Sequence, residues 1–177
     1  MRKGTLPSII VIFTLSLLGA CGHKKTAATT NANAVIEEMK KIQSTKGTAK
    51  GNAFQGSYEH TVTGVAQDCK TLNAQFKDST PIEGGTTTLV CTQQDGDFRC
   101  HDEDGNAVAG YANEGSDFGV TYSEIGKLPS GADAVAVVNL KGQFSGPNSA
   151  TGKLQLTVAE TQKDKVIKGL CVVGGDF

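Results

Sequence analysis

Acidic side chains gather around the predicted hairpin at residues 95–96 and are the first candidates for chemistry. Carboxylate oxygens are the ligands that Ca²⁺ prefers, so this group is a weak candidate calcium site. It does not fit the EF-hand pattern, because placing Gly105 at the sixth position puts Cys100 at the first ligand position. Asp is also a favoured turn residue, so we expect two solvated acidic turns and no bound metal or cofactor. The group consists of Asp95, Asp97, Asp102, Glu103 and Asp104.

Histidines are the next candidates, because a serine nucleophile needs a base beside it. His60 and His101 are the two in the body of the chain. The sequence contains no Gly-x-Ser-x-Gly elbow and no phosphate-binding loop. His60 alternates with Tyr58 and Val62, which predicts a histidine at the edge of a core. We therefore expect no catalytic residues and no enzymatic activity.

The first twenty residues are typical of a secretory signal. Arg2 and Lys3 are followed by the ten-residue apolar run Ile9–Leu18 and then by the small residues Gly19 and Ala20. A transmembrane helix needs roughly 20 apolar residues, so the run is too short to be one. Residues 1–20 are therefore predicted to be a signal peptide on an exported protein.

The end of this signal is more specific. Leu18-Gly19-Ala20-Cys21 resembles the lipobox of bacterial lipoproteins. The resemblance implies a diacylglycerol on the Cys21 sulfur, cleavage before that residue, and a fatty acyl chain such as palmitate on the new amino group. Gly22 follows, where Asp would favour retention in the inner membrane. In a bacterium with two membranes, the resemblance implies the outer one. It covers only about the first 22 residues.

Four cysteines remain, and an exported protein can join them as disulfides. An Asp-Gly pair at positions 95–96 stands midway between Cys91 and Cys100, which predicts a two-residue hairpin. In that hairpin Cys91 faces Cys100 at a non-hydrogen-bonded pair, with Cα atoms about 4.5 Å apart. This distance lies within the range of a disulfide. Cys69 is then left to pair with Cys171. The spacing typical of a zinc site is absent.

Residues 21–33 are polar and small, and we expect a flexible tether from the lipidated cysteine. His23, Lys24 and Lys25 in this tether could contact anionic head groups. The other interpretation of the three residues is a solvated linker.

Residues 34–47 are predicted to form a short amphipathic helix. Asn33 is a candidate N-cap and Gly47 a candidate stop. Three turns are marginal alone in water, so the helix should either pack on the domain or fray. A role at the membrane interface is a further alternative. The apolar stripe consists of Val35, Met39 and Ile42.

From residue 48 onward the apolar pattern has a period of two. Short alternating runs are separated by clusters of Gly, Asp, Asn, Ser and Pro. This pattern predicts an all-β domain over 48–177, an antiparallel sandwich or small barrel of about eight or nine strands preceded by the helix. The runs are centred on residues 58–62, 72–76, 89–91, 98–101, 108–111, 118–122, 134–144, 154–158 and 166–173.

The composition argues against some classes of function. The net charge of −1 carries no sign of nucleic-acid binding. Only 6% of the residues are aromatic and none is Trp, whereas ligand pockets are usually rich in aromatic side chains. We predict a non-catalytic binding or structural role at the cell envelope, with an envelope protein or polymer as partner. The alternative is a small-ligand carrier with a lipocalin-like barrel cavity.

Overall fold

The protein folds as one antiparallel sheet with a single helix packed on it. The computed structural model describes residues 32–69, 86–146, 148–163 and 165–177. The signal peptide, most of the tether and the strand expected around residues 72–76 lie outside these ranges. The elements are α2 (Ala32–Ser44), β1 (Gly56–Thr61), β2 (Thr63–Asp68), β3 (Thr86–Gln94), β4 (Asp97–His101), β5 (Ala107–Ala112), β6 (Asp117–Lys127), β7 (Asp133–Gly146), β8 (Ser149–Gln162) and β9 (Lys165–Asp176).

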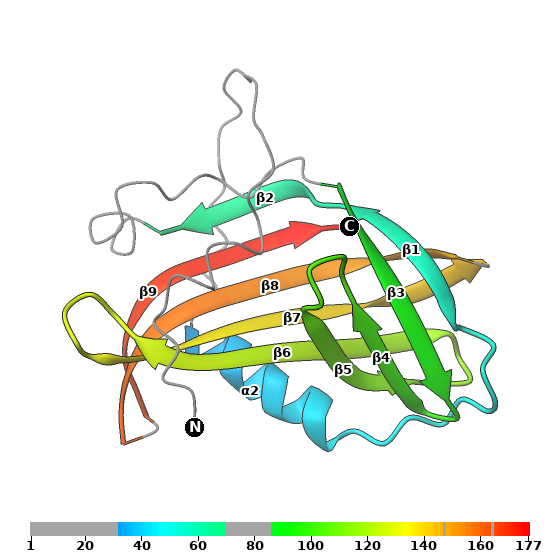
Figure 1. Cartoon of the computed structure of the whole chain (residues 1–177), viewed down its shortest axis with the longest axis horizontal. Coiled ribbons are helices and arrows are strands. Elements are labelled where there is room, and N and C mark those ends of the chain that lie inside the picture. Colours follow the sequence, from blue (N-terminus) through cyan, green and yellow to red (C-terminus); the bar gives the residue numbers. More distant parts are fainter. Residues whose placement is uncertain (1–31, 70–85, 147, 164) are drawn as a thin grey trace.

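The strands from β3 to β9 follow one another as antiparallel neighbours. The full order is β1-β3-β4-β5-β6-β7-β8-β9-β2. The two outermost strands, β1 and β2, are consecutive in the chain and are joined at Val62. The segment 56–68 thus pairs with β3 through its first half and with β9 through its second half. This arrangement nearly closes the sheet into a barrel (Figure 1). The prediction of an all-β fold with a preceding helix is confirmed, and the barrel is the form it takes.

The barrel has two ends, which we name by their residues. The hairpin end holds the β3–β4 turn at Asp95-Gly96 and the β5–β6 turn at 113–116. The lysine end holds the β6–β7 turn at 128–132 and the β8–β9 turn around Lys163. Strands β4 and β5 are shorter than β6, β7 and β8, so these three extend past them toward the lysine end (Figure 1).

Aromatic side chains fill the interior near the hairpin end. The Phe144 ring stacks on Phe54 with centroids 4.2 Å apart and on Phe118 at 4.6 Å. Phe98 meets Phe144 edge-on at 5.3 Å and is almost completely buried. Toward the lysine end the core consists of smaller side chains: Leu128, Ala134, Ala136, Val158, Leu170, Cys171 and Val173.

Helix α2 packs on the outer wall of the barrel. Side chains of β7 alternate between the two faces of the sheet. Leu140 and Phe144 lie in the core, and Val137 and Asn139, at the alternate positions, are buried on the outer face. Val35 and Ile42 of the helix are buried too. The predicted stripe is therefore used for packing on the domain.

The helix bounds differ from those expected. It starts at Ala32, so Asn33 lies inside the helix and is not its N-cap. It ends at Ser44, before the expected limit of 47. Gly47 instead lies against the main chain of Gly96, where a Cβ atom would collide. The chain must leave the helix early to make this close approach. No helix in the described ranges is long and apolar enough to cross a membrane.

Candidate functional site

The acidic residues lie in two separate turns. At the hairpin end, Asp95 accepts a hydrogen bond from the Gly51 amide over 3.0 Å. Asp97 instead pairs with Arg99 at 2.9 Å. Asp102 accepts two hydrogen bonds from Asn106, one from its amide and one from its side chain, both 2.8 Å. Asp95 thus links the β3–β4 turn to the segment at Gly51, Asp97 pairs along β4, and Asp102 stabilises its own turn.

Strand β4 separates these turns, so the candidate calcium ligands do not converge. Asp95 and Asp97 stand at its start, and Asp102 and Asp104 follow its end. Among the residues that the structure describes, no group of three or more His, Cys, Asp or Glu side chains could hold a metal ion. The weak calcium candidates are therefore turn residues.

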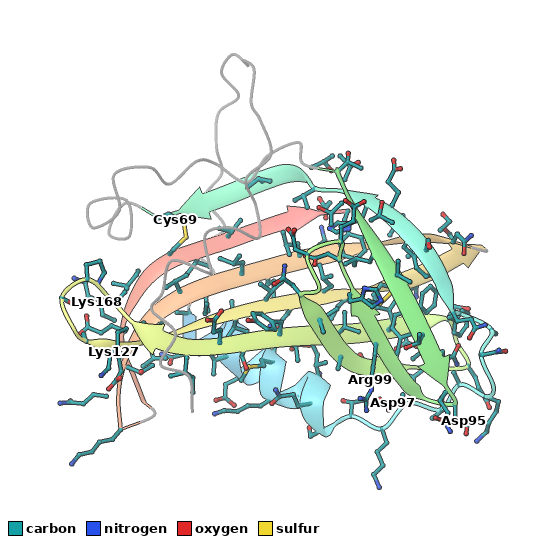
Figure 2. All side chains as sticks on the ribbon, in the orientation of Figure 1. Cys69, Asp95, Asp97, Arg99, Lys127 and Lys168 are labelled. Carbon is teal, nitrogen blue, oxygen red and sulfur yellow. A yellow bond between two sulfur atoms is a disulfide. The ribbon has the colours of Figure 1, made fainter. Side chains whose placement is uncertain are left out.

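The four body cysteines form two disulfides that hold the barrel wall. Cys91 and Cys100 are direct partners in the β3–β4 register, with Cα atoms 4.0 Å apart. This is the pair that the hairpin geometry predicts. Cys69, just after β2, is bonded to Cys171 on β9 across 102 residues of sequence. The second disulfide fastens the strand pair that closes the sheet (Figure 2). Disulfides are typical of exported proteins in oxidising compartments.

The two histidines lie on opposite faces of the wall. His101 is exposed on the outer face, and its Nδ1 lies 3.2 Å from the Asp102 carbonyl oxygen. His60 points inward from β1, with its ring 5.9 Å from that of Phe177. They form no joint site, because their side chains point to opposite faces of the sheet.

One ring nitrogen of His60 lacks a hydrogen-bond partner inside the described part of the barrel. Its Nδ1 is buried and has no hydrogen-bond partner among the described residues. Burial lowers the pKa of His60 because it disfavours the imidazolium, and a backbone interaction with Thr87 partly opposes this effect. The ring is therefore neutral at pH 7.

The space beside His60 is a small cavity of about 60 Å³. A second cavity, of about 30 Å³, adjoins His60 on the side of the phenylalanine cluster. Typical ligand pockets measure roughly 300–1,000 Å³. Each cavity has room for water but not for the ligand of a lipocalin-like carrier. The larger one is lined by His60, Thr87, Leu89, Asn106, Tyr122 and Leu154, among others.

One acidic side chain inside the barrel, Glu124, was not predicted from the sequence. The Tyr122 hydroxyl donates a hydrogen bond to Glu124 Oε2 over 3.0 Å. Burial, together with the Glu124 carboxylate, raises the pKa of Tyr122. Their i, i+2 spacing on β6 could have indicated this pair from the sequence, because such residues share one face of a strand.

The outer wall carries no large apolar patch in the described ranges. Two large apolar side chains are exposed there, Val90 at 40% and Ile125 at 75%. They lie on different strands, β3 and β6. A partner that binds this wall meets a mainly polar surface with isolated apolar contacts. In comparisons with known proteins, no family model, curated protein or solved structure matches the chain.

Proposed function

We propose that the chain is a non-catalytic lipoprotein, anchored through Cys21, that recognises an envelope protein or polymer through its outer surface. The observation that carries this proposal is the filled interior. Phe98, Phe118 and Phe144 occupy the part of the barrel where a carrier would hold its ligand. In this proposal, recognition uses groups on the outside of the barrel.

Two observations support the envelope location. The residues Leu18-Gly19-Ala20-Cys21 resemble a lipobox, and Gly22 after them favours the outer membrane of a double-membraned bacterium. Two disulfides fit an oxidising compartment outside the cytoplasm. In this proposal the membrane is one partner and the recognised envelope component is the other.

A second candidate function uses the cavity beside His60. The buried Nδ1 without a described partner is the observation that favours it. A ligand at that place would be a small polar molecule of a few atoms, because the larger cavity measures only about 60 Å³. The barrel-like fold is compatible with a lipocalin-like carrier, but the two cavities beside His60 are too small for its larger ligands.

Anchoring is tested by growing a bacterium that expresses the full chain with labelled palmitate. The label should appear on the chain, and Cys21→Ala should remove it and release the protein from the membrane fraction. The double variant Cys91→Ala, Cys100→Ala is the matched control and should keep the label. An unlabelled parent chain, or a labelled Cys21→Ala variant, would contradict the proposal.

Filling the cavity beside His60 distinguishes recognition through the outer surface from binding of a small ligand inside the barrel. His60→Phe removes the free nitrogen and occupies the space, while the outer wall is unchanged. If the surface mediates recognition, saturable binding of the labelled chain to isolated envelopes should be equal for parent and variant, with folding checked by thermal melting. Native mass spectrometry should also find the purified chain without a bound ligand. Loss of binding in a folded His60→Phe variant would favour the cavity.

A further inference from the structure

Exposed lysines gather at one end of the barrel. Lys127, Lys163 and Lys168 are exposed there, on or beside the β6–β7 and β8–β9 turns. Figure 2 shows Lys127 and Lys168 at the opposite end from Asp95 and Asp97. Asp133 pairs with Lys127 at 2.6 Å, and Glu160 lies opposite Lys168 in the register of β8 and β9, so these two carboxylates offset part of the positive charge.

Helix α2 enters the domain at this same end. The Ala32 side chain lies 3.4 Å from where a Cβ of Gly169 would be, four residues after β9 begins. From there the helix runs toward the hairpin end. Its Val35 carbonyl meets Asn139, and its Glu38 carboxylate, one turn later, meets Lys141 at 2.6 Å. Because β7 runs from the lysine end to the hairpin end, these successive contacts fix the direction of the helix.

The tether therefore joins the domain at its lysine end. Cys21 precedes Ala32 by eleven residues, which span at most about 40 Å when fully extended. The hairpin end lies further away by the length of β7, whose fourteen residues span roughly 45 Å. An anchor at Cys21 thus keeps the lysine end within about 40 Å of the membrane, whereas the hairpin end is free to lie farther away. Lys24 and Lys25 add two more positive charges between the anchor and the helix.

We infer that the lysine end docks on the anionic phospholipid surface of the membrane and that the hairpin end points away from it. This inference rests on the proposed lipid anchor. Lysines near an anionic surface are attracted to it, and the attraction is screened by salt. The turns at Asp95-Gly96 and 113–116 then form the face that a partner reaches first.

The test compares amine reactivity at the two ends of the full lipidated chain. The chain is added to preformed vesicles of phosphatidylcholine, alone or mixed with phosphatidylglycerol, and treated with a membrane-impermeant amine reagent. Mass spectrometry then measures the modification of each lysine. On the anionic vesicles, modification of Lys127, Lys163 and Lys168 should slow by about fivefold, the effect expected from one lysine at such a surface. High salt should remove the difference.

Lys46 and Lys50 are the matched internal controls. They are exposed in the segment that crosses the hairpin end, where Ala49 donates to Ala112 over 3.1 Å. Their modification should be equal on both kinds of vesicle. The inferred orientation would be overturned if the anionic lipid slowed modification equally at both ends. It would also be overturned if the lipid slowed the modification of Lys46 and Lys50 alone.

Charge variants separate this inference from the anchor itself. The triple variant K127Q, K163Q, K168Q should still float with vesicles, while K46Q, K50Q serves as the matched control. Amide exchange in the turn 128–132 should slow on anionic vesicles for the parent and the control but not for the triple variant. A parent chain that does not float would refute the anchor and the orientation together. A parent that floats without the difference in exchange would refute the orientation alone.

Discussion

The side chain of Asn139 donates a hydrogen bond from Nδ2 to the main-chain oxygen of Val35 over 2.8 Å, and both residues are buried. The Thr121 hydroxyl donates to the Oδ1 atom of Asn139 over 2.7 Å. The first bond joins α2 to β7 across 104 residues of sequence, and the second joins β6 to β7. They satisfy the polar groups that helix packing removes from water.

Asn139→Ala should destabilise the fold. It removes two hydrogen bonds from a buried site, so we expect the free energy of unfolding to fall by about 2 kcal/mol. The melting temperature should fall by about 5–10 °C, measured by circular dichroism. Gln143→Ala is the matched control, because Gln143 is exposed on the same strand. Equal melting of the two variants would contradict the role assigned to Asn139.

Truncating Phe144 should lower the free energy of unfolding more than Asn139→Ala does. Its ring touches those of Phe54, Phe98 and Phe118, so Phe144→Ala opens a cavity at the centre of the cluster. We expect a loss of about 3–5 kcal/mol in denaturant unfolding. Phe144→Leu should cost clearly less because it retains most of the volume. If both substitutions cost under about 1 kcal/mol, the interior is not packed as described.

The two disulfides should differ in their contribution to stability. Replacing Cys69 and Cys171 by Ala opens a loop of 102 residues, and replacing Cys91 and Cys100 opens one of 9. In the chain-entropy model the losses are about 4.7 and about 2.6 kcal/mol. Denaturant unfolding of the two double variants should show this order. Peptide mapping without reduction checks the pairs first, and a peptide linking Cys69 to Cys91 or Cys100 would contradict the hairpin argument.

Stability should fall as the pH drops below about 6.5, the ordinary pKa of histidine. The pKa of His60 is lowered in the folded state, so the unfolded chain binds more protons between the folded and unfolded pKa values. The contribution of His60 is therefore full above the unfolded pKa and is lost as pH falls through the folded value. Melting curves across this range should show a weaker pH dependence for His60→Gln than for the parent.

His101→Gln is the matched control for this effect, because His101 is exposed on the outer wall. Its melting curves should follow the parent at each pH. An unchanged pH dependence in His60→Gln would show that the neutral ring does not contribute.

Several features of the fold follow from local sequence. The Asp-Gly pair and its flanking residues predict the β3–β4 hairpin, and the structure has that register, from Gln94 opposite Asp97 to Cys91 opposite Cys100. The stripe containing Val35 and Ile42 likewise predicts a helix with one packed face. These predictions succeed because turn geometry and side-chain periodicity are set within a few residues.

The sequence by itself thus determined the all-β class, the local hairpin and the amphipathic helix. Only the tertiary structure decided how the sheet closes. Strand β2 was not predicted, because Thr63–Asp68 lacks a clear alternation and contains Gly64 at a φ of +62° beside a register shift. The tertiary structure also decided that His60 and His101 lie on opposite faces of the sheet and that Asn139 binds helix α2 on the outer wall. These outcomes depend on contacts between residues far apart in the chain, whose energies no local pattern encodes.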